Sequence, residues 1–162
     1  KEVFNCELPE RYCIVYSYYN RINDEQDIKN IKEFCKKHDL TLVTLGAPQM
    51  WIKRHLVVKP FEALRIFQRA QFVITDTFHG TIFSAKYCDR FAVMQRESNS
   101  NKLGDLVKTL GLENHLIDSF SRLEDVIQVQ VDRTQIEKLI QNERNRTLAY
   151  LENNLKEAKS EY

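Results

Sequence analysis

Residues 72–84, Phe-Val-Ile-Thr-Asp-Thr-Phe-His-Gly-Thr-Ile-Phe-Ser, constrain the fold of this chain more than any other stretch. Residues 72–74 form a short apolar run with β-branched side chains, which is typical of a buried parallel strand. The side-chain oxygens of Asp76 and Thr77 are suited to accept the unpaired amide hydrogens of a first helical turn. The stretch therefore predicts a strand, a tight turn and a helix in immediate succession.

His79 and the residues around it suggest a function for this turn. His79 would stand at the tip of the strand, beside the positive end of the helix dipole, where free backbone amides bind anions. Gly80 has no Cβ and allows a backbone or a ligand to approach closely. The amides of His79, Gly80 and Thr81 are candidates for holding one anion, assisted by the hydroxyl of Thr77 or Thr81. The alternative is an ordinary turn with a surface histidine, and the spacing alone does not separate the two.

Strand and helix patterns alternate along the rest of the chain. Further strands are expected at residues 12–18, 40–45, 91–94 and 115–118, and helices at residues 25–38, 61–69, 80–87, 103–110 and 132–158. Residues 49–59 fit a short strand or an irregular loop, and residues 95–101 a polar loop. Such alternation implies βαβ units, so we expect a Rossmann-like α/β fold: a parallel sheet of about five strands with helices on both faces, ending in a long helix.

The 162 residues suffice for one domain with a core of its own. We expect a linker or lead-in arm at residues 1–11, the Rossmann-like domain at residues 12–131, and a C-terminal helix at residues 132–162 packed on or beside it. One face of this helix carries an apolar stripe, formed by Ile136, Leu139, Ile140, Leu148, Leu151 and Leu155. Self-association through this stripe, or through the ligand-binding edge of the sheet, is therefore expected.

Composition excludes several classes of partner. The net charge of +1 gives no reason to expect nucleic acid or an anionic membrane as a partner. No apolar run approaches the roughly 20 residues that span a bilayer, so no transmembrane segment is expected. The histidines lack the spacing of metal ligands, so neither a metal nor a cofactor is predicted.

The cysteines indicate the compartment. The chain contains Cys6, Cys13, Cys35 and Cys88, with no Cys-x-x-Cys pair among them. Three of them fall in expected strands or helices, which favours reduced thiols in a cytoplasmic protein. A disulfide between Cys6 and Cys13 remains the minor alternative.

In a parallel sheet, ligands bind outside the carboxyl ends of the strands. The turns after Tyr18, Thr77 and Met94 should therefore meet in one crevice, with His79 in the middle turn. This placement favours the functional interpretation of His79 over the ordinary turn. In the first turn, Arg21 is a candidate partner for a carboxylate, although a solvated loop arginine is more common.

Several neighbouring residues are weaker candidates for ligand binding or catalysis. Arg96, Asn99 and Lys102 would stand in a polar loop able to close over a ligand. Asp76 fits a turn cap better than a catalytic base. The aromatic residues near the turn are expected in the core; they are Phe72, Phe78, Phe83 and Phe91.

These residues resemble a known family. Residues 60–64 and 70–84, with the stretch Thr-Asp-Thr-Phe-His-Gly-Thr at residues 75–81, resemble the signature of the polysaccharide pyruvyl transferases. The resemblance continues in residues 90–94 and in residues 103–112, which end in Leu-Gly-Leu. Together these stretches cover roughly the middle third of the chain.

The resemblance implies a two-domain, GT-B-like enzyme with its active site between two Rossmann-like halves, of which this chain would be the C-terminal half, inactive alone. It implies transfer of pyruvate from phosphoenolpyruvate onto two hydroxyls of a sugar, giving a cyclic ketal in a cell-surface polysaccharide. The partners would be phosphoenolpyruvate, a sugar acceptor and the N-terminal domain of the same protein. His79 would belong to the phosphoenolpyruvate site, and two basic positions of the family fall on Lys102 and His115.

Two other functions remain open. The first is half of a sugar-nucleotide-dependent GT-B glycosyltransferase, which would commonly show an acidic residue or pair after the central turn; no convincing one is found. The second is a non-catalytic anion-binding α/β module. A phosphoacceptor version would need acids at the end of the first strand, where Ser17, Tyr18 and Tyr19 stand.

Overall fold

The computed structural model describes residues 8–160 and, in the last helix, the side chains as far as residue 155. Most of the expected lead-in arm lies outside the described residues, and so does the proposed pairing of Cys6. The chain divides into two compact units, Lys1–Val131 and Asp132–Tyr162.

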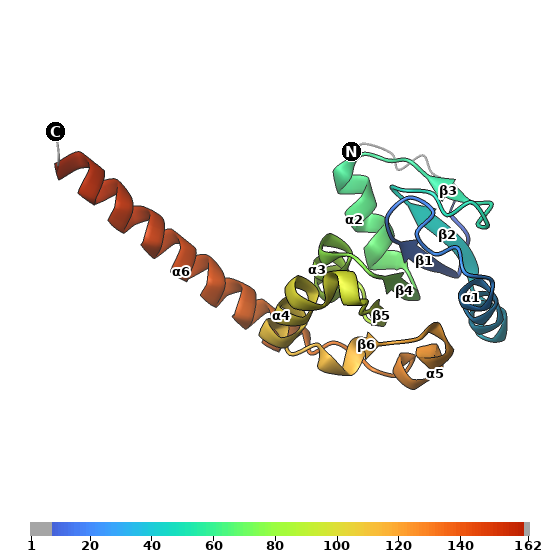
Figure 1. Cartoon of the computed structure of the whole chain (residues 1–162). Coiled ribbons are helices and arrows are strands. Elements are labelled where there is room, and N and C mark those ends of the chain that lie inside the picture. The colour runs from blue at the N-terminus through green and yellow to red at the C-terminus, as the bar shows by residue number, and fades with distance from the viewer. Residues whose placement is uncertain (1–7, 161–162) are drawn as a thin grey trace. The chain divides into compact units, whose positions relative to one another are not determined.

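The first unit is built on a six-stranded, all-parallel sheet with the strand order β3-β2-β1-β4-β5-β6 (Figure 1). The strands are β1 (Tyr12–Tyr16), β2 (Thr41–Leu45), β3 (His55–Leu56), β4 (Phe72–Thr75), β5 (Phe91–Met94) and β6 (Leu116–Ile117). The predicted Rossmann-like sheet is confirmed. It has one strand more than expected, because the stretch left open between residues 49 and 59 contains β3, which pairs with β2 at the sheet edge.

The α-helices are α1 (Glu25–Lys37), α2 (Pro60–Arg69), α3 (Phe78–Tyr87), α4 (Ser100–Leu110), α5 (Leu123–Val126) and α6 (Arg133–Ser160), and the 3-10 turns are η1 (Glu97–Asn99), η2 (Glu113–His115) and η3 (Phe120–Arg122). Asp24 caps α1 by accepting from the Asp27 amide at 3.0 Å. Gly111 ends α4 in the left-handed region, at φ 65°, where glycine has no Cβ to clash. Both ends lie where capping chemistry predicts them.

The segment from residue 95 to 101 differs from its prediction as a polar loop. It contains the turn η1, and α4 begins directly after it at Ser100 rather than at residue 103. The Ser100 hydroxyl donates to the Glu97 carbonyl at 3.0 Å, which joins the turn to the helix. Local polar contacts therefore order a stretch that lacks apolar side chains.

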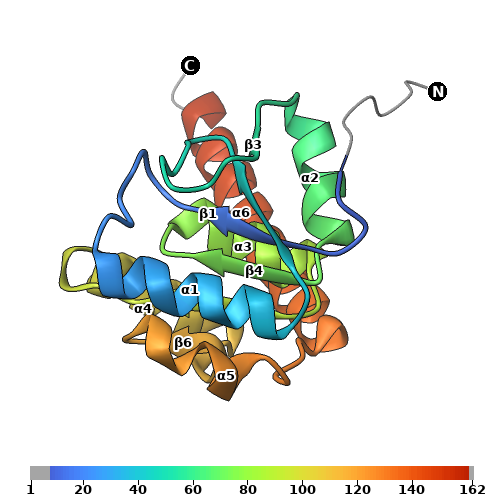
Figure 2. The same cartoon turned by 90° about the vertical axis from the view of Figure 1, so that its right-hand side faces the viewer.

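Strand alternation divides the core between the two faces of the sheet. Cys13 and Val15 face the cluster that includes Phe34 of α1 and Leu123 of α5. From the opposite face, the Tyr12 hydroxyl donates to the Ile66 carbonyl of α2 at 2.7 Å. Figure 2 shows α1 and α5 on one side of the sheet and α2 on the other. Helices thus cover both faces, as the near-continuous apolar strands require.

His115 belongs to the core and lies near the amino end of β5. It is 3% exposed, and its ring stacks on Phe91 with centroids 4.0 Å apart. The Nδ1–H donates to the Phe91 carbonyl at 2.9 Å. The second basic position implied by the family resemblance therefore falls on a packed residue, away from the carboxyl edge of the sheet.

Burial lowers the pKa of His115, and its bond to the Phe91 carbonyl opposes that shift only in part. The unfolded chain therefore takes up this proton more readily than the folded chain, so the contribution of His115 to stability is present above its unfolded pKa of about 6.5 and is lost as the pH falls below it. We expect the urea midpoint of the unaltered chain to fall more steeply between pH 7.5 and 5.5 than that of His115→Gln. Equal slopes would contradict a buried neutral imidazole.

The second unit is the helix α6, which is mostly polar. Three leucines of its predicted apolar stripe, Leu148, Leu151 and Leu155, are between 47% and 63% exposed. Their spacing places them on one side of the helix. An exposed stripe of this kind favours association.

The unaltered chain is expected to self-associate at high concentration, and Leu148→Glu with Leu151→Glu should shift it toward the monomer in light scattering. The control is Ala149→Glu with Asn153→Glu, which adds the same charge on the opposite side of the helix. A monomeric unaltered chain, or equal shifts in both double variants, would exclude this stripe.

Candidate functional site

The turn between β4 and α3 is held by threonine hydroxyls. Thr77 is the N-cap of α3, and its Oγ1 accepts from the Gly80 amide at 3.0 Å. The Thr75 hydroxyl donates to the Tyr16 carbonyl at 2.7 Å, which ties this turn to the end of β1. The prediction of a cap is thus confirmed for Thr77 and wrong for Asp76, whose carboxylate contacts other residues.

Gly80 and Thr81 are buried within this turn. A Cβ on Gly80 would overlap the Thr75 hydroxyl and lie 2.7 Å from both the Thr77 hydroxyl and the Tyr16 ring. The Thr81 amide and hydroxyl both donate to the Thr77 carbonyl, at 3.0 and 2.9 Å. Both residues thus use their polar groups inside the protein, and the close approach at Gly80 comes from neighbouring side chains.

The order of the strands defines where a ligand would bind. The chain runs from β1 outward to β2 and β3, and then returns to β4 on the other side of β1. Between β1 and β4 the connections leave toward opposite faces, and in open parallel sheets this switch point is where ligands bind. The turn that ends in Thr77 stands at this point.

A pocket of about 540 Å³ lies at the switch point. Residues from three turns line it: Tyr18 and Arg21 after β1; Asp76, Thr77 and Phe78 after β4; Glu97, Ser98, Asn99, Asn101, Lys102 and Leu103 after β5. The expected convergence of the three turns is therefore seen in the structure. Of the predicted binding residues, Thr77, Arg21 and Lys102 come together here.

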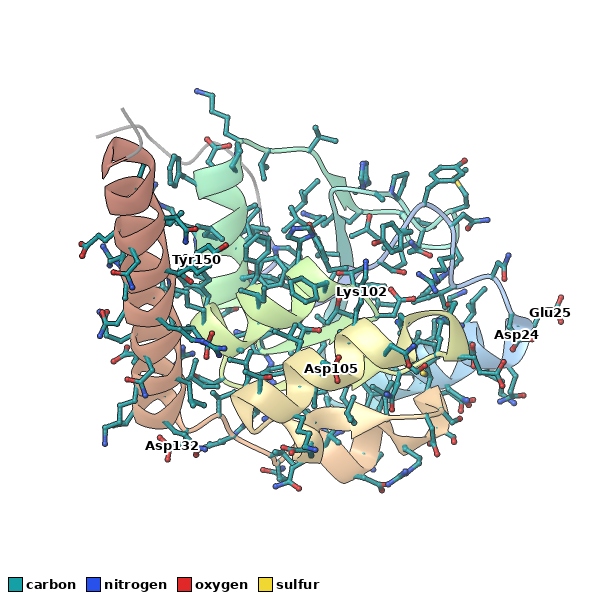
Figure 3. All side chains as sticks on the ribbon, turned by 60° about the vertical axis from the view of Figure 1, so that its left-hand side comes forward. Asp24, Glu25, Lys102, Asp105, Asp132 and Tyr150 are labelled. Atoms are coloured by element: carbon teal, nitrogen blue, oxygen red, sulfur yellow. The ribbon has the colours of Figure 1, made fainter. Side chains whose placement is uncertain are left out.

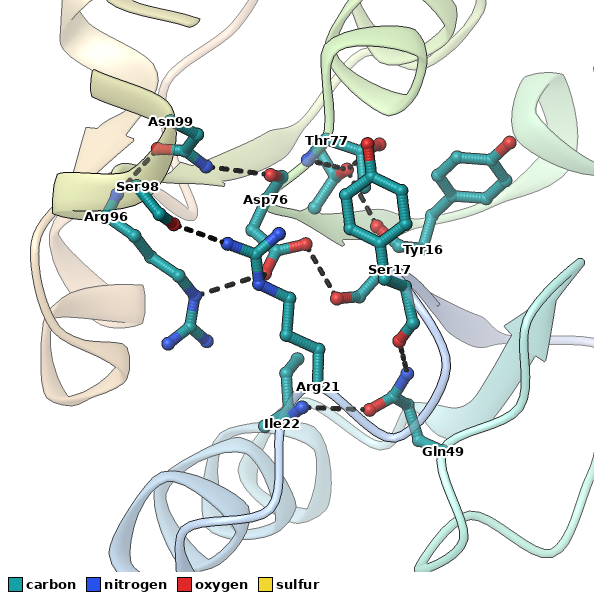
Figure 4. A network of polar contacts seen from close by, with 12 residues as sticks. Tyr16, Ser17, Arg21, Ile22, Gln49, Asp76, Thr77, Arg96, Ser98 and Asn99 are labelled. Atoms are coloured by element: carbon teal, nitrogen blue, oxygen red, sulfur yellow. Dashed lines mark hydrogen bonds and ion pairs between the residues drawn. The ribbon is translucent and has the colours of Figure 1, made fainter. Parts of the chain in front are cut away.

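The carboxylate of Asp76, a residue that lines the pocket, connects the three turns through polar contacts (Figure 4). Its side chain is 1% exposed. The Ser17 hydroxyl donates to Oδ1 at 2.6 Å, and Arg96 Nε donates to Oδ2 at 3.1 Å. Arg21 Nε forms an ion pair with the same Oδ2 at 3.4 Å. One buried acid thus has a hydroxyl and two guanidinium groups as partners.

The turn after β1 is held from below by Gln49. This amide is fully buried, donates to the Tyr18 carbonyl at 2.7 Å and accepts from the Ile22 amide at 3.1 Å. Asn20 adopts a left-handed conformation, at φ 41°, which asparagine tolerates better than most residues. These contacts fix the stretch of backbone that carries Arg21.

The turn after β5 is tied to the same centre. Asn99 Nδ2 donates to the Asp76 carbonyl at 2.9 Å, and Asn99 Oδ1 accepts from the Arg96 amide at 2.8 Å. Arg21 Nη2 donates to the Ser98 hydroxyl at 2.7 Å, directly joining the first and third turns. One nitrogen of Arg96, Nη2, is buried and has no hydrogen-bond partner within the described part of the chain.

Lys102 supplies a further cation at the pocket. It is exposed and lies near the start of α4, with Asp105 further along the same helix (Figure 3). Glu97, on η1, lines the pocket as well. The wall formed by residues 97–103 therefore presents both charges to the pocket.

His79 is exposed at the start of α3 and is not among the residues that line this pocket. Its ring lies 6.0 Å from that of Phe78 and 6.4 Å from that of Phe83, measured between centroids. Phe78 was predicted in the core, but it is 43% exposed and lines the pocket. His79 is thus accessible at the carboxyl edge, beside the pocket rather than inside it.

Sequence reasoning named Arg21, Arg96 and Asn99 as candidates but missed the contacts that join them to Asp76. It predicts Asp76 as a cap and gives neither Ser17 nor Gln49 a role in the site. The available signal was that a carboxyl directly after a buried strand needs compensating partners once it is itself buried. Gln49 offers no comparable signal, because its role depends on the path of the turn after β1.

The fold and the pocket define a doubly wound α/β protein with a polar site at its switch point. The family model described as polysaccharide pyruvyl transferase matches residues 2–88, more than half of the chain. The chain therefore belongs to the polysaccharide pyruvyl transferase family. The match includes Arg21, Asp76 and His79, and ends before Arg96 and Lys102.

Three further observations accompany this assignment. A search of curated protein sequences finds no match for the chain. Within residues 8–160, as far as side chains are described (to residue 155), no cluster of three or more histidine, cysteine, aspartate or glutamate side chains is arranged to hold a metal ion. No helix in that range is both long and apolar enough to span a bilayer.

Gly80→Ala should destabilise the protein, because the new methyl group has no space among Tyr16, Thr75 and Thr77. Overpacking of this kind costs about 1–3 kcal/mol, which thermal or urea unfolding would resolve. Gly104→Ala is the matched control: its Cβ would meet only the flexible end of Gln95, at 3.2 Å, and alanine favours the helix. Equal stability of the two variants would contradict the packing described for the turn.

Proposed function

We propose that this chain contributes a phosphoenolpyruvate-binding site to an enzyme that transfers pyruvate onto a sugar of a cell-surface polysaccharide. The family match over residues 2–88 carries this proposal, because it includes the strand, turn and helix at the switch point. The pocket at that point supports it with Arg21 and Lys102, since a donor with a phosphate and a carboxylate needs fixed cations and hydrogen-bond donors.

The reaction sets specific demands on the site. Two sugar hydroxyls add to the central carbon of phosphoenolpyruvate, the methylene carbon gains a proton, and inorganic phosphate leaves. Of the two hydroxyl protons released, the balance assigns one to the new methyl group and one to the phosphate. Positive charge develops at the central carbon, so the site must deliver a proton and hold the departing phosphate.

His79 is the proposed residue for one of these tasks. It is exposed at the carboxyl edge and adjoins Phe78, which lines the pocket. An imidazole is able to donate a proton near neutral pH, or to hold a phosphate oxygen. Thr77, Gly80 and Thr81 shape the turn that places it, and Arg21 and Lys102 are the proposed anion ligands.

The proposal includes a second domain. In a GT-B-like enzyme the sugar acceptor would lie between this chain and an N-terminal Rossmann-like domain of the same protein. The chain alone would then bind the donor weakly and would not turn it over. A cytoplasmic location is proposed as well, since Cys13 and Cys35 are buried free thiols, which suits a reducing compartment.

A binding screen tests the proposal. The chain would be titrated with phosphoenolpyruvate, UDP- and GDP-sugars, and a phosphoryl mimic, with thermal shift and heteronuclear NMR as readouts. Phosphoenolpyruvate should perturb the amides of residues 76–79 and of Arg21. Binding of a sugar nucleotide without phosphoenolpyruvate would support the glycosyltransferase alternative, and binding of the phosphoryl mimic alone would support the anion-binding module.

His79→Ala, introduced into the complete protein, is expected to lower pyruvyl transfer by at least about a hundredfold, the lower range for loss of a general acid. The measurement is phosphate release from phosphoenolpyruvate that depends on the acceptor. His38→Gln is the control, because His38 pairs with Glu124 on a different part of the molecule. Unaltered turnover in His79→Ala would exclude His79 from both proposed tasks.

A further inference from the structure

Arg21 and Arg96 meet Asp76 through the same atom of their guanidinium groups. In each case the nitrogen nearest Asp76 is Nε, at 3.4 Å for Arg21 and 3.1 Å for Arg96. A guanidinium carries five N–H donors in a rigid plane, so the use of Nε leaves the two terminal nitrogens to face other groups. Asp76 therefore fixes the direction of each arginine without occupying its bidentate end.

Arg21 is the arginine that this arrangement directs toward the pocket. It lines the pocket, its side chain is 25% exposed, and its Nη2 reaches across to the Ser98 hydroxyl (Figure 4). A free loop arginine would lose rotamer entropy on binding a ligand, whereas one already held by a buried carboxylate has lost most of it. Arg21 is preorganised for an anion in the pocket.

Arg96 also contacts Asp76, but it is not directed toward the pocket. It does not line the pocket, and Asp27 of α1 is a second acidic group within its electrostatic reach. Burial and the neighbouring Asp24 raise the pKa of Asp27, while Arg96 acts to lower it. Because the Nε atoms of Arg96 and Arg21 both lie near Asp76 Oδ2, the single negative charge of Asp76 is shared between the two arginines.

We propose that Asp76 is a positioning residue, whose buried carboxylate orients Arg21 and secures the segment 96–102 so that the pocket binds a phosphate or carboxylate group. This inference rests on the proposed function for the identity of the donor, but it concerns how the site is organised. It gives Asp76 a role that neither a helix cap nor a catalytic base provides. The ligand class is an anion small enough for a pocket of about 540 Å³.

A double-mutant cycle on the whole chain tests this role. The unaltered chain, Asp76→Asn, Arg21→Ala and the double variant would be titrated calorimetrically with inorganic phosphate and with phosphoenolpyruvate. Asp76→Asn should weaken phosphate binding by at least about tenfold when Arg21 is present, a loss typical of a charge-assisted contact, and should have little further effect once Arg21 is removed. Equal losses in both backgrounds, or no loss, would overturn the proposal.

A second readout separates positioning from general loosening of the fold. In the unaltered chain the Nε–H signals of Arg21 and Arg96 should be resolved and slow to exchange in proton–nitrogen NMR, and both should exchange faster in Asp76→Asn. Asp105→Asn is the matched control, since it removes the same charge from an exposed site on the helix that carries Lys102 (Figure 3). It should change neither the signals nor the affinity.

Ser17→Ala keeps the test decisive if Asp76→Asn does not fold. It removes the 2.6 Å hydroxyl contact to Asp76 and retains every charge. It should weaken phosphate binding severalfold, and only in the presence of Arg21. Unchanged affinity in Ser17→Ala, with the arginine signals unaffected, would overturn the positioning role.

Whether the pocket binds phosphoenolpyruvate is judged separately from the role of Asp76. Binding of phosphate but not of phosphoenolpyruvate would remove the proposed function and leave the role of Asp76 intact. Binding of phosphoenolpyruvate that is insensitive to Asp76→Asn would overturn the role of Asp76 and leave the proposed function intact.

Discussion

The burial of one carboxylate governs how the carboxyl edge of this sheet is organised. A charge taken out of water needs compensation, and removal of one partner from a buried pair costs about 3–5 kcal/mol. At Asp76 the compensation comes from Ser17, Arg21 and Arg96, which belong to the turns after β1 and β5. Turns that are distant in the sequence therefore adopt defined positions together, and the pocket is the space they enclose.

Most of the fold follows from local features of the sequence. The apolar strands, the Asp24 cap, Pro60 at the start of α2 and Gly111 at the end of α4 each carry a signal that a single sequence displays. The short strand β3 does not, because two residues are too few to show a period, and its pairing with β2 decides its structure. Likewise, η1 and the start of α4 depend on side-chain contacts that cannot be recognised in a polar stretch of sequence.

The location of the candidate site could be predicted from the sequence, but the contacts between its residues could not. Parallel topology alone brings the turns after β1, β4 and β5 to one edge, and the pocket lies there. The partners of Asp76 lie far from it in the sequence, with Ser17 and Arg21 before it and Arg96 after it, so no spacing rule links them. Phe78 illustrates the same limit, since its exposure depends on which way the first turn of α3 faces the pocket.

The contact geometry of the two arginines bears on which substitutions this site tolerates. An ammonium group has a single nitrogen, so a lysine at position 21 could not contact Asp76 and the Ser98 hydroxyl through separate nitrogens. The guanidinium of Arg21 divides these contacts between atoms of one plane, with Nε facing the Asp76 carboxylate and Nη2 donating to the Ser98 hydroxyl. The exchange of arginine for lysine, commonly regarded as mild, would here weaken the direct link between the turns after β1 and β5.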